Sequence, residues 1–167
     1  LEALGLRKGT AHLPAGDARP TRRRIEDLVP GEVLRNPRGE CFAVQQRFAP
    51  QHRQGAAALH ALWEQQPATL ARLARDDAFL SFDPTHLVFL DTETTGLAGG
   101  AGTYAFLVGC GYFEPDRSFV VRQFFMRDYG EEPAQMAALS EALEPFRAVV
   151  SFNGKAFDLP LLSLIHI

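Results

Sequence analysis

An apolar run followed by an acidic pair predicts a strand from Leu87 to Glu93, the best-defined element of the chain. Its first residues are apolar and favour β structure, and the apolar run stops at Asp91 and Glu93. Side chains of a strand alternate between two faces, so these carboxylates share one face and Thr92 lies on the other. They would lie roughly 7 Å apart, close enough to repel each other. A bound divalent cation is the simplest counter-charge for such a pair.

After this strand, the pattern predicts two more strands, a helix and a fourth strand. The two strands are expected at 104–113 and 118–126, joined by a short hairpin turn. A helix with an apolar face is expected at 131–143. Residues 148–152 are expected to form a short buried strand reached through that helix, which favours parallel pairing with the acidic strand. A further helix begins near Lys155, and this order of elements is typical of a compact α/β fold.

The residues before the acidic strand predict a smaller α+β region. A hairpin is expected around the turn Asn36–Gly39, followed by helices at 55–66 and 67–76. The first residues are rich in Gly, Pro, Ala and Arg without periodicity, which favours a mobile arm. The predicted organisation is an arm over 1–24, an amino-terminal region over 25–83 and a main domain over 84–161.

Composition and charge narrow the class of protein. The chain has 167 residues, of which 46% are hydrophobic and 22% charged, as in a soluble globular protein of about one domain. Its net charge is −3, but residues 86–167 carry 5 Lys and Arg against 10 Asp and Glu. Nucleic-acid-binding modules are usually basic, so this balance argues weakly against a pure binding module. An excess of acidic residues in this half is typical of a metal-dependent site, because bound cations would offset the negative charge.

Cys41 and Cys110 form no metal-binding pattern, and we interpret both as reduced packing residues of a cytosolic protein.

The sequence has no signal peptide and no apolar run long enough to span a bilayer, so we expect a cytoplasmic location without membrane contact. The first residue is Leu, so we expect the native start to lie upstream. The oligomeric state stays open.

A second acidic element surrounds Asp158, which lies among apolar residues within 151–162. A lone carboxylate in such a setting is costly unless it is paired. A parallel strand beside the first would bring the turn at Asn153 to the sheet edge that carries Asp91 and Glu93. Asp158 would then complete a cluster of three carboxylates, the alternative being that it caps the start of a helix.

Together these two elements resemble a known superfamily. Asp91–Leu97 (DTETTGL) followed by Asn153–Asp158 (NGKAFD) resembles the first two motifs of the DEDD-type 3′-5′ exonucleases, which have the ribonuclease H-like fold. When the segments 99–109 and 123–128 are included, the sequence is similar to the bacterial YprB-like ribonuclease H-like domain family. The resemblance covers about residues 84–161. It implies a mixed sheet made of an antiparallel meander and one parallel strand.

The resemblance also implies two-metal hydrolysis of phosphodiester bonds in a single strand or 3′ end of DNA or RNA. By the family pattern, Asp91 bridges two magnesium or manganese ions, and Glu93 and Asp158 are further ligands. A glycine after the acidic strand suits close approach of a ligand to the backbone. The residues implied in holding the terminal nucleotide and its neighbouring turn are Thr94, Thr95, Gly96, Leu97 and Asn153.

The sequence departs from this pattern after Asp158. The family also uses a Tyr or His as general base and a fourth Asp on a later helix, and the chain ends before them. We therefore expect this fragment to be inactive alone. Residues 162–167 (LSLIHI) are what a common sequencing adapter encodes, so we treat them as a non-native tail, with Leu162 itself ambiguous.

Two alternatives remain open. The first is a nucleic-acid-binding or scaffold domain that kept the fold and lost catalysis. The second is a phosphatase of the haloacid dehalogenase type, since Asp91–Gly96 loosely resembles its DxDx[TV] nucleophile loop. That family needs a second Asp where Glu93 stands, and its topology lacks the meander predicted here.

Overall fold

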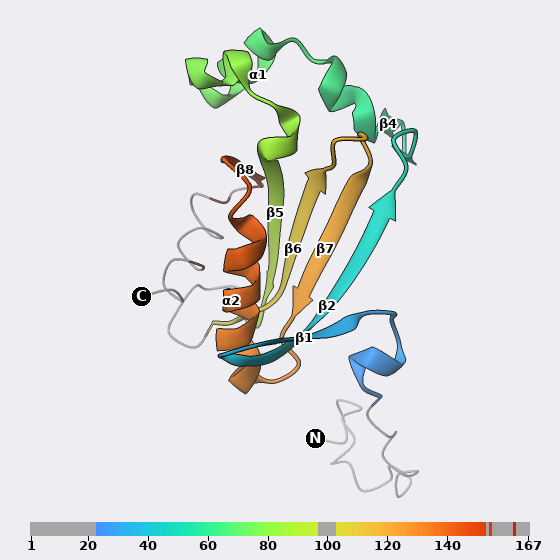
Figure 1. Ribbon diagram of the computed structural model, residues 1–167, viewed down its shortest axis with the longest axis vertical. Coiled ribbons are helices and arrows are strands. Elements are labelled where there is room, and N and C mark those ends of the chain that lie inside the picture. Colours follow the sequence, from blue (N-terminus) through green and yellow to red (C-terminus); the bar gives the residue numbers. More distant parts are fainter. Residues whose placement is uncertain (1–22, 97–102, 153, 155–161, 163–167) are drawn as a thin grey trace, which may run out of the picture.

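The computed structural model describes residues 23–96, 103–152, 154 and 162. Within this part of the chain, six strands form one mixed sheet in the order β1-β2-β7-β6-β5-β8, and a helix crosses one of its faces (Figure 1). The strands of this sheet are β1 (Glu32–Asn36), β2 (Gly39–Phe48), β5 (Leu87–Thr94), β6 (Ala105–Phe113), β7 (Phe119–Phe125) and β8 (Ala148–Ser151). A separate two-stranded ribbon pairs β3 (Arg53–Gln54) with β4 (Ala57–Ala58).

The predicted α/β class and mixed sheet are confirmed. Strands β5, β6 and β7 form the antiparallel meander, and β8 returns parallel to β5 with Leu90 opposite Ser151. The crossover before β8 is helix α2 (Glu132–Leu143), which begins with Pro133 in its first turn, where a missing N–H removes no helical hydrogen bond. None of the described helices combines the length and apolar content needed to cross a membrane.

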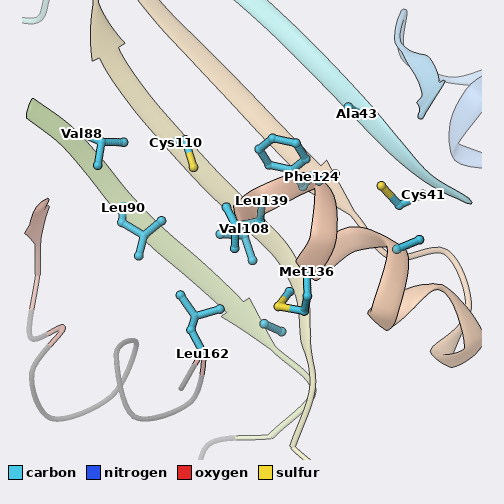
Figure 2. Close-up of a cluster of buried hydrophobic side chains, with 13 residues drawn as sticks. Cys41, Ala43, Val88, Leu90, Val108, Cys110, Phe124, Met136, Leu139 and Leu162 are labelled. Atoms are coloured by element: carbon cyan, nitrogen blue, oxygen red, sulfur yellow. The ribbon is translucent and has the colours of Figure 1, made fainter. Parts of the chain in front are cut away.

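Helix α2 packs against one of the two faces of the sheet. The face that it covers, which we term the helix face, carries Val88, Val108 and Phe124, each 0% exposed. Leu139 of α2 packs into the same cluster and is 1% exposed (Figure 2). The opposite face, which we term the acid face, carries the other set of alternating side chains of β5, namely Leu87, Phe89, Asp91 and Glu93.

The β1–β2 hairpin extends the same sheet, because β2 pairs antiparallel with β7. Arg127 lies just after β7, and its side chain is 17% exposed. Its guanidinium forms ion pairs with Glu26, Glu40 and Glu131, which lie before β1, on β2 and at the start of α2. Arg127 therefore joins two positions of the amino-terminal region, Glu26 and Glu40, to the start of α2.

Two predictions of local structure were wrong. The helix expected at 55–66 is replaced by β4 and a 3₁₀ helix at Leu59–Glu64, since Gly55 has a φ of 59° in the β3–β4 turn. A right-handed helix cannot include that angle. The strand β8 was expected to be buried, yet Val149 and Val150 are 47% and 43% exposed at the edge of the described sheet.

The other predicted elements fall into two groups. The hairpin around Asn36–Gly39 and the helix after Pro67 are confirmed, the latter as α1 (Pro67–Ala74). The arm over 1–22, the turn at 98–102 and most of the helix after Lys155 lie outside the described residues. The remaining described 3₁₀ helices are Ile25–Asp27, Asp77–Ser81, Pro84–His86 and Tyr129–Glu131.

Loss of the Arg127 guanidinium should destabilise the fold. Arg127→Ala leaves three carboxylates without their shared cation in a partly buried setting, so we expect the free energy of unfolding to fall by about 2–4 kcal/mol. The matched control is Arg47→Ala, whose side chain is 55% exposed in pairs with Glu114 and Asp116. That change should cost no more than about 1 kcal/mol in urea unfolding. Equal losses for the two variants would contradict this role of Arg127.

Both cysteines are free and buried, as predicted. Burial raises the pKa of the Cys110 thiol to about 12 and also raises the pKa of Cys41. Because the thiolate is the reactive form, a raised pKa and an inaccessible sulfur both slow alkylation. We expect iodoacetamide to modify the native chain at least about a hundredfold more slowly than the urea-unfolded chain. Rapid labelling of the native chain, followed by mass spectrometry, would contradict this packing.

Candidate functional site

The acidic pair lies at the end of β5 on the acid face. Asp91 and Glu93 are exposed and alternate with the half-buried Thr92 and Thr94, so the alternation predicted for this strand is present. No described residue forms a hydrogen bond or ion pair with either carboxylate. Two like charges on one face are thus left for solvent or a cation to neutralise.

The turn after β5 is held by its two threonines. The Thr94 hydroxyl donates to the Gly96 carbonyl at 2.8 Å. The Thr95 backbone N–H donates to the Tyr104 carbonyl at 3.0 Å, and the Tyr104 N–H donates back to the Thr95 hydroxyl at 3.1 Å. The ring of Tyr104 packs against Tyr129, with centroids 4.7 Å apart. These contacts hold the strand end that carries the carboxylates.

The described residues on either side of the Asp158 stretch lie near the end of β5. The parallel register places Ser151 opposite Leu90, one residue before Asp91. Gly154 is buried, and Leu162 is 7% exposed in the cluster that contains Leu90 (Figure 2). Both described residues that bracket the Asp158 stretch therefore belong to the packed interior.

Three predicted site residues lie outside the described part of the chain: Leu97, Asn153 and Asp158. The convergence of Asp158 with the acidic pair therefore stays a prediction. The interpretation of residues 163–167 as a non-native tail stays one too, whereas Leu162 packs as a core leucine.

The described donors fit part of a hard-cation site. Carboxylate oxygens are the ligands that magnesium and manganese prefer in proteins, and Asp91 and Glu93 present them without competing partners. The described residues contain no group of three or more His, Cys, Asp or Glu that could hold a metal ion. A complete set therefore depends on a ligand from beyond them, and Asp158 is the predicted one.

Among the described residues, aromatic side chains cover one half of the acid face and leave the half near Asp91 uncovered. Away from the carboxylates, Phe119 packs against Phe89 and Phe113 with ring centroids 5.9 and 4.9 Å apart. An apolar groove of about 680 Å³ adjoins this cluster, between α1 and the β5–β8 edge. At the level of Asp91, the neighbouring strands instead present Gly109 and Gln123. Sequence periodicity did not single out these two residues, because cross-strand register is absent from it.

Comparison with known proteins relates the residues around both acidic elements to a known superfamily. Residues 88–166, which span both acidic elements, match the model of the RNase_H superfamily. This part of the chain belongs to the ribonuclease H superfamily. The chain is also 38% identical over 85 residues to the uncharacterized protein YprB of Bacillus subtilis (strain 168). That alignment covers 51% of this chain but only 20% of the relative, so the chain spans about a fifth of its length.

The ribonuclease H-like assignment confirms the YprB-like resemblance drawn from the two motifs. It points to nucleic acid as the class of substrate and to hydrolysis as the class of reaction. The antiparallel meander and this assignment together leave the haloacid dehalogenase alternative without support.

Manganese should stabilise the domain through the acidic pair. A cation that binds only the folded state raises the melting temperature, and we expect a rise of about 3 °C or more in excess manganese. Asp91→Asn and Glu93→Gln should reduce or abolish this rise. They should also slightly stabilise the cation-free domain, because each removes one of two like charges. Asp116→Asn, an exposed acid of the β6–β7 turn, is the control and should retain the full rise.

Proposed function

We propose that this domain hydrolyses phosphodiester bonds of DNA or RNA from the 3′ end, using two magnesium or manganese ions. One observation carries the proposal: Asp91 and Glu93 lie exposed and unpaired by described residues on one face of a ribonuclease H-like sheet. The parallel register that sets Ser151 opposite Leu90 supports the proposal of Asp158 as a third carboxylate at this sheet end.

In this proposal the carboxylates of Asp91, Glu93 and Asp158 hold the cations. When bound, the cations supply an activated water and neutralise charge that develops on the phosphate. The rigid turn at Thr94 and Thr95 holds the carboxylates at the strand end and presents its backbone to the terminal nucleotide. The threonine hydroxyls themselves are engaged within this turn, so their contribution to substrate binding would come through its shape.

The remaining proposed contacts are those of Gly96, Leu97 and Asn153 beside the carboxylates. Gly96 leaves room for a nucleotide to approach the backbone as far as the described residues show, since the nearest of their atoms to a side chain built there is the Thr103 hydroxyl at 3.9 Å.

The direct test is a manganese-dependent nuclease assay on the full-length protein with single-stranded DNA and RNA. Asp91→Ala should reduce the rate at least about a hundredfold, because it removes one of the carboxylates that would hold the cations. Asp116→Asn should retain the wild-type rate. Substrates labelled at the 5′ end should yield a ladder of shortened products, as 3′-5′ polarity requires.

Equal activity of wild type and Asp91→Ala would reject catalysis at this site. Retained binding of single strands without any hydrolysis would favour the alternative of a non-catalytic nucleic-acid-binding or scaffold domain.

A further inference from the structure

Two glycines of β6 lie on the acid face, and only one has a packing explanation. A Cβ added to Gly111 would lie 2.7 Å from the Phe119 ring and 3.6 Å from the Cβ of Phe89. The aromatic cluster therefore requires a glycine at that position. A Cβ added to Gly109 would meet only the Asp91 carbonyl oxygen among the described residues, at 3.9 Å.

Gly109 thus weakens a central strand without relieving a clash in the described structure. Glycine inside a strand is destabilising relative to alanine, because it loses more backbone freedom on folding. A strand glycine that does not serve packing marks a place where a ligand or another backbone approaches the sheet closely. The space above Gly109 is therefore a candidate binding position.

The residues on either side of this space are chemically distinct. Gly109 is paired with Asp91 on β5 and with Gln123 on β7, so the three form a row across the acid face. With strands about 4.8 Å apart, the backbones of Asp91 and Gln123 lie about 10 Å from each other. The Gln123 side chain is half-buried, and no described group hydrogen-bonds its amide. The row is thus a carboxylate, a gap without a side chain, and an amide with free hydrogen-bonding capacity.

We propose that a single strand of nucleic acid crosses the sheet at Gly109, with its sugar–phosphate backbone against the glycine and the Gln123 amide as a hydrogen-bond partner. This inference rests on the proposed function and adds a substrate-positioning residue to it. The amide N–H₂ can donate to a phosphate oxygen and its carbonyl can accept from a sugar hydroxyl. A gap two strand spacings wide admits one backbone and excludes a second one beside it.

The test measures binding and stability of the full-length protein in parallel. Binding is followed by fluorescence anisotropy with a labelled single-stranded DNA of about twelve nucleotides and its RNA counterpart, in calcium. Gly109→Val should raise the dissociation constant at least about tenfold, because its methyl groups fill the proposed strand position. Gln123→Ala should raise it about threefold to tenfold, as expected for one lost hydrogen bond.

Two control variants separate this site from general effects on the sheet. Gln45 is exposed on the neighbouring strand β2, opposite Arg122 on the helix face, and Gln45→Ala should leave binding unchanged. Gly109→Val should not lower the melting temperature by more than about 2 °C, since the space contains no described side chain. Gly111→Ala should lower it by about 3 °C or more through its clash with Phe119.

Three results would overturn the inference. Unaltered binding by Gly109→Val would show that no strand passes there, and a Gly109→Val protein that melts as early as Gly111→Ala would show that another protein segment fills the space. Absence of strand binding by the wild type would reject it as well. The proposed catalysis is tested separately, because its failure appears as equal nuclease activity in wild type and Asp91→Ala, whatever Gly109→Val does to binding.

Discussion

The position of β5 between two partners is the constraint on which the candidate site depends. Antiparallel pairing with β6 fixes which side chains lie beside the carboxylates, and parallel pairing with β8 brings a distant segment to the same sheet end. Since the period of a strand is two residues, this register also decides the face of every side chain. A slip of one residue would move Asp91 and Glu93 under α2, where two charges could not be accommodated.

One face of the sheet carries the buried core that stabilises the fold, and the other carries the candidate site. Helix α2 and the helix face supply the buried cluster that holds the meander rigid. The acid face keeps polar groups and a glycine at the level of Asp91, while its aromatic cluster packs the other half. Function can therefore occupy one half of one face without interrupting the core, which is how a rigid scaffold positions exposed groups accurately.

The amino-terminal region is joined to this scaffold more closely than its own sequence suggests. The hairpin continues the sheet through β7, and Arg127 links it to the start of α2 through three carboxylates. Because the 3₁₀ helix Tyr129–Glu131 and α2 follow soon after Arg127, this network also supports the sheet end where Tyr129 contacts Tyr104. Stability of the hairpin and geometry of the candidate site are thus connected through the same strand.

The sequence by itself determined the local features of the domain. The apolar run before Asp91 predicted β5, and the strand period predicted that Asp91 and Glu93 share a face. The crossover helix predicted the parallel β8, because strand period and connection length are local properties. Two motifs together were sufficient for the superfamily. Residues 55–66 were misassigned because their apolar spacing suits a helix, whereas the positive φ of Gly55 closes a turn there instead.

Only the tertiary structure decided what depends on contacts between strands. It joined the hairpin to β7, exposed β8 at the edge of the described sheet, and placed Gly109 and Gln123 in a row with Asp91. Cross-strand register arises from packing among segments far apart along the chain, and no periodicity within one segment encodes it.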